Sequence, residues 1–345
     1  MGDKRPSPGV RVNRAHEPSY AGGPTFSKLR LVLEPSGLAG VDVAIVGAPT
    51  DETTSYRPGA RFGPRAIRTA DYGGGSPPSD HHMDLGLDPY TVLSVVDYGD
   101  VPVRPADALY NRDRIRETVG EIVAAGAVPV VLGGDHAIAY PDVSAVAEAL
   151  RPATVGIVHF DAHADDAEDV WEVRYSHGTP LRYLVEEGWV RGEHVVQIGL
   201  RGYWPFPEEF AWARERGLRW FRMDVVEDRG IGPVIEETLE MLARCDHLFL
   251  SVDIDVVDPS AAPGTGTPEP GGMTARQLLR AVRRLAAARG FAGMEVVEVS
   301  PPYDVAEITA RLAHRVVLEA LSGLALHRTG RAPAPEDPTP SAASG

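Results

Sequence analysis

One stretch of the chain combines an apolar run with three potential metal ligands spaced two residues apart. Val155-Gly-Ile-Val-His-Phe160 is followed directly by Asp161-Ala-His163-Ala-Asp165. Successive side chains of an extended chain point to opposite faces, so Asp161, His163 and Asp165 face the same way if the extended geometry continues past Phe160. Two carboxylates and an imidazole on one face are donors of the kind that bind divalent metal ions.

A second apolar run ends in carboxylates with the same spacing. His247-Leu-Phe-Leu-Ser-Val-Asp253-Ile-Asp255 carries two acids at its end. A single Asp after a strand is usually a capping or turn residue, but four uncompensated carboxylates within a few ångströms would repel one another and raise their pKa values. Two divalent cations would neutralise that charge, and hard oxygen ligands with imidazoles suit Mn²⁺ better than zinc or calcium. The spacing therefore predicts a binuclear metal site.

Apolar runs typical of strands alternate with helical segments along most of the chain. The expected strands are residues 41–47, 91–97, 128–132, 155–160, 194–198, 218–222, 247–252 and 293–299. The expected helices are residues 64–70, 114–125, 141–150, 180–187, 208–216, 235–244, 274–289 and 308–326. This alternation predicts a mostly parallel sheet of about eight strands covered by helices. The pattern alone fits either an eight-stranded barrel or an open, doubly wound sheet.

In both architectures the active site lies just beyond the carboxyl ends of the strands. His136, the acids of the two metal motifs and Glu298 all follow or end expected strands. No internal repeat or interior linker interrupts the pattern, so residues 26–328 are expected to form a single domain. Residues 1–25 lack periodicity and are expected to form an extended or disordered arm, and residues 329–345 are rich in Pro, Ala and Ser and are expected to be disordered.

Composition excludes several classes of protein. The chain has 345 residues, is 43% hydrophobic and carries a net charge of −15, which is unsuited to binding nucleic acid or an anionic membrane. Cys245 is the only cysteine, so an intramolecular disulfide and a cysteine-based zinc site are excluded. No signal-like apolar core or stretch of membrane-spanning length occurs in the sequence. We therefore expect a cytoplasmic protein that acts on a small molecule.

Several motifs resemble signatures of the ureohydrolase family, which includes arginases and agmatinases. The three main ones are Gly133-Gly-Asp-His136, Asp161-Ala-His-Ala-Asp165 and Ser251-Val-Asp-Ile-Asp-Val-Val-Asp-Pro259. Others resemble the agmatinase-like branch: Tyr56-Arg-Pro-Gly-Ala-Arg-Phe-Gly-Pro-Arg-Ala-Ile-Arg68, Tyr175-Ser-His-Gly-Thr-Pro180, Gln197-Ile-Gly-Leu-Arg-Gly202, Gly264-Thr-Gly-Thr-Pro-Glu-Pro-Gly-Gly272 and Val297-Glu-Val-Ser-Pro-Pro-Tyr-Asp304. The resemblance covers roughly residues 40 to 327.

This resemblance implies an open three-layer α/β/α sandwich and hydrolysis of a guanidino compound to urea and an amine. It also implies two Mn²⁺ ions per subunit, with another divalent metal such as nickel as an alternative, and assembly into homotrimers or homohexamers. Agmatine, a substrate of polyamine metabolism, is the expected guanidino compound. Guanidinobutyrate, another guanidino acid, guanidine and a biosynthetic guanidino precursor remain alternatives. A metal-binding subunit without activity is disfavoured because the residues expected for catalysis are all present.

The resemblance also implies roles for individual residues. The first metal ion would be held by His136, Asp161, Asp165 and Asp253. The second would be held by Asp161, His163, Asp253 and Asp255, so that Asp161 and Asp253 bridge the pair. Glu298 would bind the guanidinium, His177 would bind substrate and transfer protons, and Asp165 would also accept a hydrogen bond from the attacking hydroxide.

The loop after the first metal motif bears on the substrate. Residues 165–177 contain no Asn and carry four acids besides Asp165, which favours a cationic tail over a carboxylate. Arg174 in the same loop would favour a guanidino acid if it pointed inward. Ala137 and Val305 stand where the family commonly has Ser and His, close enough to the site to affect substrate choice.

Other residues near the motifs have structural interpretations. His159 lies within the buried run and is expected to pack in the core or behind the metal ligands, while Asp135 and Asp258 are expected to orient loops. Trp171 and Trp204 lie in loops that could border the pocket.

Overall fold

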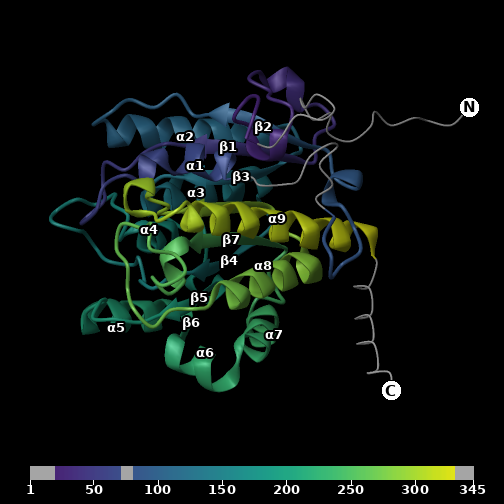
Figure 1. The fold of residues 1–345 in the computed structure, drawn as a ribbon. Helices are drawn as coiled ribbons and strands as arrows, with labels where there is room; N and C mark the ends of the chain where they lie inside the picture. Colours follow the sequence, from purple (N-terminus) through teal and green to yellow (C-terminus); the bar gives the residue numbers. More distant parts are fainter. Residues whose placement is uncertain (1–19, 71–80, 331–345) are drawn as a thin grey trace, which may run out of the picture.

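A single parallel sheet with helices on both faces makes up the computed structural model, which describes residues 20–70 and 81–330 (Figure 1). Its strands are β1 (Val43–Ala48), β2 (Val95–Asp100), β3 (Val128–Gly133), β4 (Val155–Phe160), β5 (Val195–Leu200), β6 (Arg219–Arg222), β7 (His247–Asp253) and β8 (Gly293–Val297). They lie in the order β2-β1-β3-β8-β7-β4-β5-β6, and every adjacent pair is parallel. The sheet is open, so the barrel alternative is excluded and the expected three-layer sandwich is confirmed.

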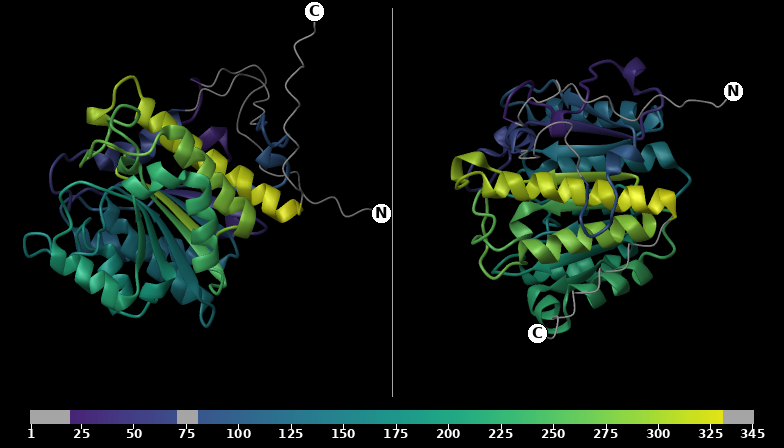
Figure 2. Two further views of the ribbon diagram at one scale, coloured as in Figure 1. Left: turned by 90° about the horizontal axis from the view of Figure 1, so that it is seen from below. Right: turned by 45° about the vertical axis from the view of Figure 1, so that its right-hand side comes forward.

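Two helical layers cover the sheet, as seen edge-on in Figure 2, left. One layer packs its apolar side chains with one face of the strands and contains α1 (Gly63–Thr69), α6 (Met223–Arg229), α7 (Ile231–Met241), α8 (Ala275–Arg289) and α9 (Ile308–Thr329). The other contains α2 (Ala108–Ala124), α3 (Ala139–Leu150), α4 (Pro180–Glu186) and α5 (Pro207–Arg216). With both faces covered, every residue of β4 is buried, which explains the near-continuous apolar runs in the sequence.

Local capping chemistry sets several boundaries that periodicity did not predict. α2 begins at Ala108, six residues before the expected start, because the Asp107 side chain accepts a hydrogen bond from the backbone N–H of Tyr110 and caps the helix. The predicted strand 91–97 is wrong at its start, since Pro89–Thr91 form a 3₁₀ turn. Strict alternation also fails once, because two helices, α6 and α7, separate β6 from β7.

The order of the strands brings distant parts of the chain together. β3, β8, β7 and β4 are neighbours in the sheet, and β1 lies beside β3. Their carboxyl ends meet at one edge, the usual position of a ligand site in an open α/β sheet. None of the helices in residues 20–70 and 81–330 is long and apolar enough to cross a membrane. Residues 1–19 of the expected arm (1–25) and residues 331–345 of the expected tail (329–345) lie outside the described residues, and both expectations stay predictions.

Candidate metal centre and active site

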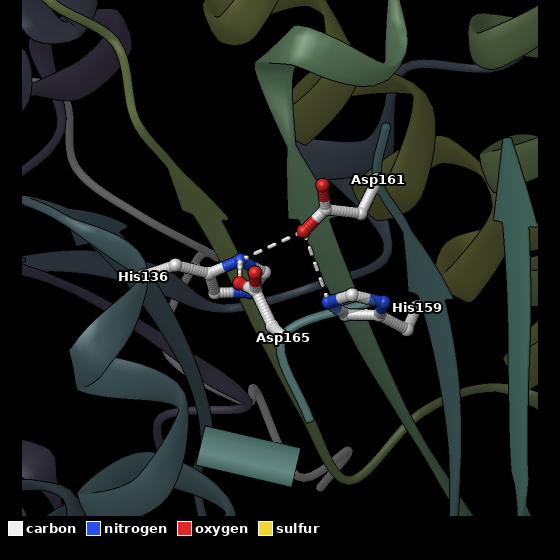
Figure 3. Close-up of side chains that lie close together, drawn as sticks. All are labelled: His136, His159, Asp161 and Asp165. Carbon is white, nitrogen blue, oxygen red and sulfur yellow. Dashed lines mark ion pairs between the residues drawn. The ribbon is translucent and has the colours of Figure 1, made fainter. Parts of the chain in front are cut away.

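His136, in the turn after β3, lies at the centre of a cluster of carboxylates. Its Nδ1 is 3.0 Å from Oδ2 of Asp161, 2.9 Å from Oδ2 of Asp165 and 3.3 Å from Oδ2 of Asp253. All four residues are buried. Figure 3 shows Asp161 and Asp165 pointing toward the His136 ring from the end of β4.

The donor atoms around His136 fit a bound cation better than a hydrogen-bond network. An imidazole nitrogen carries at most one proton and donates it in one direction. Within the described residues, neither His136 Nδ1 nor Asp161 Oδ2 has a partner with hydrogen-bond geometry, although both are buried. Donor atoms about 2.1 Å from an octahedral cation lie about 3 Å from one another. The spacing around His136 matches that arrangement, so the residues present fit a divalent metal ion.

A second group of donors shares Asp161 with the first. Nδ1 of His163 lies 3.1 Å from Oδ2 of Asp255 and 3.5 Å from Oδ1 of Asp161. Asp161, His163 and Asp255 form a second set that could hold a metal ion. Asp253 lies between the sets, since its Oδ1 accepts a hydrogen bond from the backbone N–H of Asp255 at 2.8 Å. The structure therefore brings together all six residues predicted as ligands.

The charges of these groups create a competition between protons and metal ions. Burial lowers the pKa of His136 and of His163, but the surrounding carboxylates raise both well above the usual value. Burial and the charges of Asp255 and Asp161 raise the pKa of Asp253. Because bound metal needs neutral imidazoles and ionised carboxylates, metal binding will release protons.

The backbone of the motif Asp161–Asp165 does not have the extended geometry that the sequence predicted. β4 ends at Phe160, so the extended geometry does not continue through the motif. The φ angle of Asp165 is +48°, in the left-handed region. A turned backbone, rather than alternation along a strand, directs the Asp165 side chain toward His136.

His159 is closer to the candidate ligands than the sequence suggested. Its Nε2 lies 3.2 Å from Oδ2 of Asp161, and its ring stacks on His136 with centroids 4.9 Å apart. It belongs geometrically to the group formed by His136, Asp161 and Asp165, as Figure 3 shows. The signal was present in the sequence, because His159 precedes Asp161 by two residues on a strand and so faces the same way.

His177 and Glu298 meet beside the candidate metal ligand His136. Nδ1 of His177 is 3.1 Å from Oε1 of Glu298, which also accepts a hydrogen bond from the backbone N–H of His136 at 2.9 Å. Oε2 of Glu298 is buried and has no hydrogen-bond partner in the described part of the chain. The φ angle of Glu298 is +61°, so the backbone is held in the left-handed region immediately beyond β8.

Comparison with known proteins decides the family. A sequence profile of the arginase family matches residues 41–323. This chain belongs to the arginase family.

Individual relatives share the family but differ in name. Guanidinopropionase of Pseudomonas aeruginosa is 38% identical over 329 residues, which span 94% of this chain and 98% of that protein. Mitochondrial agmatinase of Gallus gallus is 40% identical over 297 residues, 86% of this chain and 84% of that protein. The structure of proclavaminate amidinohydrolase from Streptomyces clavuligerus has a TM-score of 0.82 and 37% identity and covers 90% of this chain and 100% of its own. The resemblance found in the sequence is thereby confirmed.

A cavity of about 430 Å³ lies next to the metal ligands of this arginase-family chain. It is lined by Ser55, His163, Asp165, Asp169, Val170, Trp171, His177, Gly178, Trp204, Phe206, Glu209, Asp253 and Thr267. As expected, Trp171 and Trp204 border it. Ser55, Phe206 and Glu209 were not predicted, because their segments carry no ligand spacing and reach the cavity only through the fold.

The acidic loop contributes less to the cavity than its composition suggested. Of its four acids besides Asp165, only Asp169 lines the cavity, and Asp166 is buried elsewhere with its pKa raised to about 8 by burial and the charge of Glu209. Arg174 is not a lining residue. Its guanidinium lies 3.3 Å from Glu187 and over the ring of Tyr183.

Asp135 and Asp258 orient loops, as expected. Oδ2 of Asp135 accepts hydrogen bonds from the backbone N–H and the hydroxyl of Thr53 at 2.9 and 2.8 Å. Asp258 accepts from the backbone N–H groups of Ser260, Gly271 and Gly272. Neither belongs to the two candidate ligand groups.

A buried pair of acids lies behind His136, on the side away from the candidate metal ions. Nε2 of His136 is 2.9 Å from Ser251 Oγ and 3.6 Å from Oε1 of Glu295. Burial raises the pKa of Asp142 well above its usual value, and the neighbouring Glu295 raises it further. Glu295 is the acid of this pair that faces Nε2 of His136. Such a partner keeps the proton on the outer nitrogen of a metal-binding imidazole and strengthens the inner one as a ligand.

We expect Glu295→Gln to weaken metal binding by about 10–100-fold, the usual effect of removing a group that orients a ligand. Titration of the metal-free protein with Mn²⁺ measures it directly. Glu148→Gln, at an exposed residue of α3, the helix that carries Asp142, is the matched control and should bind Mn²⁺ as the parent does. Equal affinities for the two variants would show that the charge behind His136 does not support the ligand.

Proposed function

We propose that this protein hydrolyses a guanidino compound to urea and an amine with two Mn²⁺ ions. The observation that carries the proposal is the position of Glu298: its Oε1 accepts a hydrogen bond from the backbone N–H of His136, and its buried Oε2 has no hydrogen-bond partner within the described residues. A guanidinium is a planar donor that pairs well with a carboxylate. Glu298 can therefore hold the substrate's guanidinium at the metal centre.

Each group of this site has a distinct task in the reaction. Two cations held by the candidate ligands would supply charge stabilisation and would lower the pKa of water to near neutrality. Glu298 orients the guanidinium, because its other oxygen is held by His136 and His177. His177 donates the proton that the departing amine requires. The carbon of a guanidinium is a poor electrophile because its charge is delocalised, so hydrolysis depends on this combined orientation and proton supply.

The lining of the cavity supports agmatine as the substrate. Trp171, Trp204 and Phe206 offer an apolar wall for a methylene chain. Asp169 and Glu209 add negative charge, and none of the described lining residues is Arg or Lys. Arg174 is the cationic side chain of the loop that could have bound a substrate carboxylate. Its guanidinium is instead hydrogen-bonded to Glu187. A second amine on the tail is therefore favoured over a carboxylate.

Guanidino acids are the second candidate because of the relatives' names. Guanidinopropionase and guanidinobutyrase of Pseudomonas aeruginosa are 38% and 36% identical to this chain, close to the 40% of the avian agmatinase. Overall identity therefore does not separate the substrates, and the lining of the cavity is the stronger argument.

A urea-release assay with added Mn²⁺ tests both substrate classes. We expect kcat/KM for agmatine to exceed that for 4-guanidinobutyrate at least about tenfold and that for arginine by more, since juxtaposed like charges cost several kcal/mol. Glu209→Gln should narrow this preference by raising KM for agmatine. Glu168→Gln, exposed in the same loop as Asp169 and not a lining residue, should not. A higher kcat/KM for 4-guanidinobutyrate would reject the agmatine assignment, and no urea from any guanidino compound would reject the reaction.

Activity should depend on pH through His177. Burial lowers its pKa, but the hydrogen bond and charge of Glu298 and the charges of Asp165 and Asp135 raise it to about 9. A general acid works only while protonated, so we expect kcat to fall as pH rises through about 9. On the acid side, protonation of His136 and His163 displaces the metal ions, so activity and metal content should fall together. Rates from pH 6 to 10 with metal analysis at each point test this, and a maximum near pH 5 would contradict it.

A further inference from the structure

Both ring nitrogens of His177 are occupied by partners from distant parts of the chain. Nδ1 faces Oε1 of Glu298 at 3.1 Å. Nε2 lies 3.1 Å from the backbone nitrogen of Ser55 and 2.8 Å from its hydroxyl oxygen. Ser55 belongs to the loop between β1 and α1, which β1 places beside β3 and the metal site.

The backbone amide of Ser55 determines the tautomer of His177. An N–H group can only donate, so Nε2 of the neutral ring must present its lone pair to Ser55. The proton of the neutral ring then sits on Nδ1, from which it is donated to Glu298. This assignment needs no assumption about the substrate or the metal ions.

The hydroxyl of Ser55 suits the other protonation state. When His177 is protonated, both nitrogens are donors, and Nε2–H needs an acceptor. Ser55 Oγ, at 2.8 Å, provides it. One residue therefore offers a donor to the neutral ring and an acceptor to the charged ring.

The surroundings hold the ring in this position. The backbone N–H of His177 donates to Oγ1 of Thr53 at 3.0 Å, and Thr53 is itself anchored on Asp135. The acids that act on the charge of His177 are Glu298 from the end of β8, Asp165 from the loop after β4 and Asp135 from the turn after β3. All three stabilise the charged ring in place.

We propose that the Ser55 hydroxyl relays the proton from Nε2 of His177 to the amine that leaves in the cavity. The proposal rests on the function proposed above, and Ser55 is one of the residues that line that cavity. In the step, Nε2–H passes to Ser55 Oγ while the original Oγ–H passes to the nitrogen of the amine as its bond to carbon breaks. His177 becomes neutral, Ser55 remains a hydroxyl, and the electron pair of the broken C–N bond stays on the amine.

Two substitutions at Ser55 distinguish the effect of its hydroxyl on kcat from the effect of its backbone amide. Ser55→Ala keeps the N–H and removes the relay, and kcat with Mn²⁺ and agmatine should fall about 10–100-fold, part of the usual contribution of acid–base catalysis. KM and bound metal should change less than about twofold. Ser55→Thr restores a hydroxyl and should recover most of the lost kcat. Ser36→Ala, at an exposed residue outside the site, is the matched control. A kcat for Ser55→Ala within twofold of the parent would overturn the relay.

A second measurement does not depend on any substrate. Deuterium exchange at the ring C2 position, followed by mass spectrometry, reports the titration of each histidine in the full manganese-loaded protein. Ser55→Ala removes the acceptor of the charged ring, so the midpoint of His177 should fall by about one pH unit, the effect of one hydrogen bond to a charged group. An unchanged midpoint would show that Ser55 does not partner the charged ring. If the midpoint falls and no guanidino compound is hydrolysed, the contact stands and the proposed function fails.

Discussion

We expect Asp161→Asn to lose both bound metal ions and at least about a thousandfold in kcat/KM, because metal ions supply several kcal/mol of transition-state stabilisation. Asp161 belongs to both candidate ligand groups, and its two oxygens face different ones. Burial raises its pKa, but the charge of His159 and the nearby imidazoles of His136 and His163 lower it well below the usual value. It is therefore a carboxylate available to two cations at once. An amide has half the acceptor oxygens and no charge, so neither group would be complete.

Metal analysis of the purified variant is the direct measurement. Asp169→Asn makes the same chemical change at an exposed residue that lines the cavity and belongs to neither ligand group, so it should keep its full metal content. Thermal unfolding of both variants checks that they are folded. Two equivalents of manganese in folded Asp161→Asn would show that Asp161 does not hold the metal pair.

His177→Ala, in contrast to Asp161→Asn, should retain its bound metal. Its kcat should fall about 10²–10⁴-fold, the usual contribution of a general acid–base residue. His177 contacts Glu298, Ser55 and Thr53, and it is not among the residues grouped as possible ligands. Its removal therefore leaves every metal donor in place. The decline of kcat above about pH 9 should also disappear, since the group that titrates there is gone.

The comparison that tests this role uses another histidine. His327→Ala, at an exposed position near the end of α9, should leave both kcat and metal content unchanged. Metal content and kcat are measured on the same preparation, so that the loss of a metal ligand can be distinguished from the loss of a general acid. Loss of manganese from His177→Ala would assign the residue to the metal site instead of to proton transfer.

The sequence by itself determined the class of fold and most of the site. Apolar runs alternating with helical segments specified a parallel sheet, because strands buried on both faces must be apolar throughout. Acids at two-residue spacing after two such runs indicated a metal site, because so much negative charge in one place needs cations. Motif resemblance added His177 and Glu298, which spacing alone does not connect to the metal ligands.

Only the tertiary structure decided how these parts face one another. Local periodicity does not encode which strands pair, yet the place of β8 between β3 and β7 is what sets Glu298 against His136. A turn of the backbone decided the direction of Asp165, since its positive φ is incompatible with the extended geometry on which alternation depends. Packing alone turned Arg174 toward Glu187 and brought Ser55 to His177. These contacts join residues up to 162 positions apart, and no local pattern in a single chain records them.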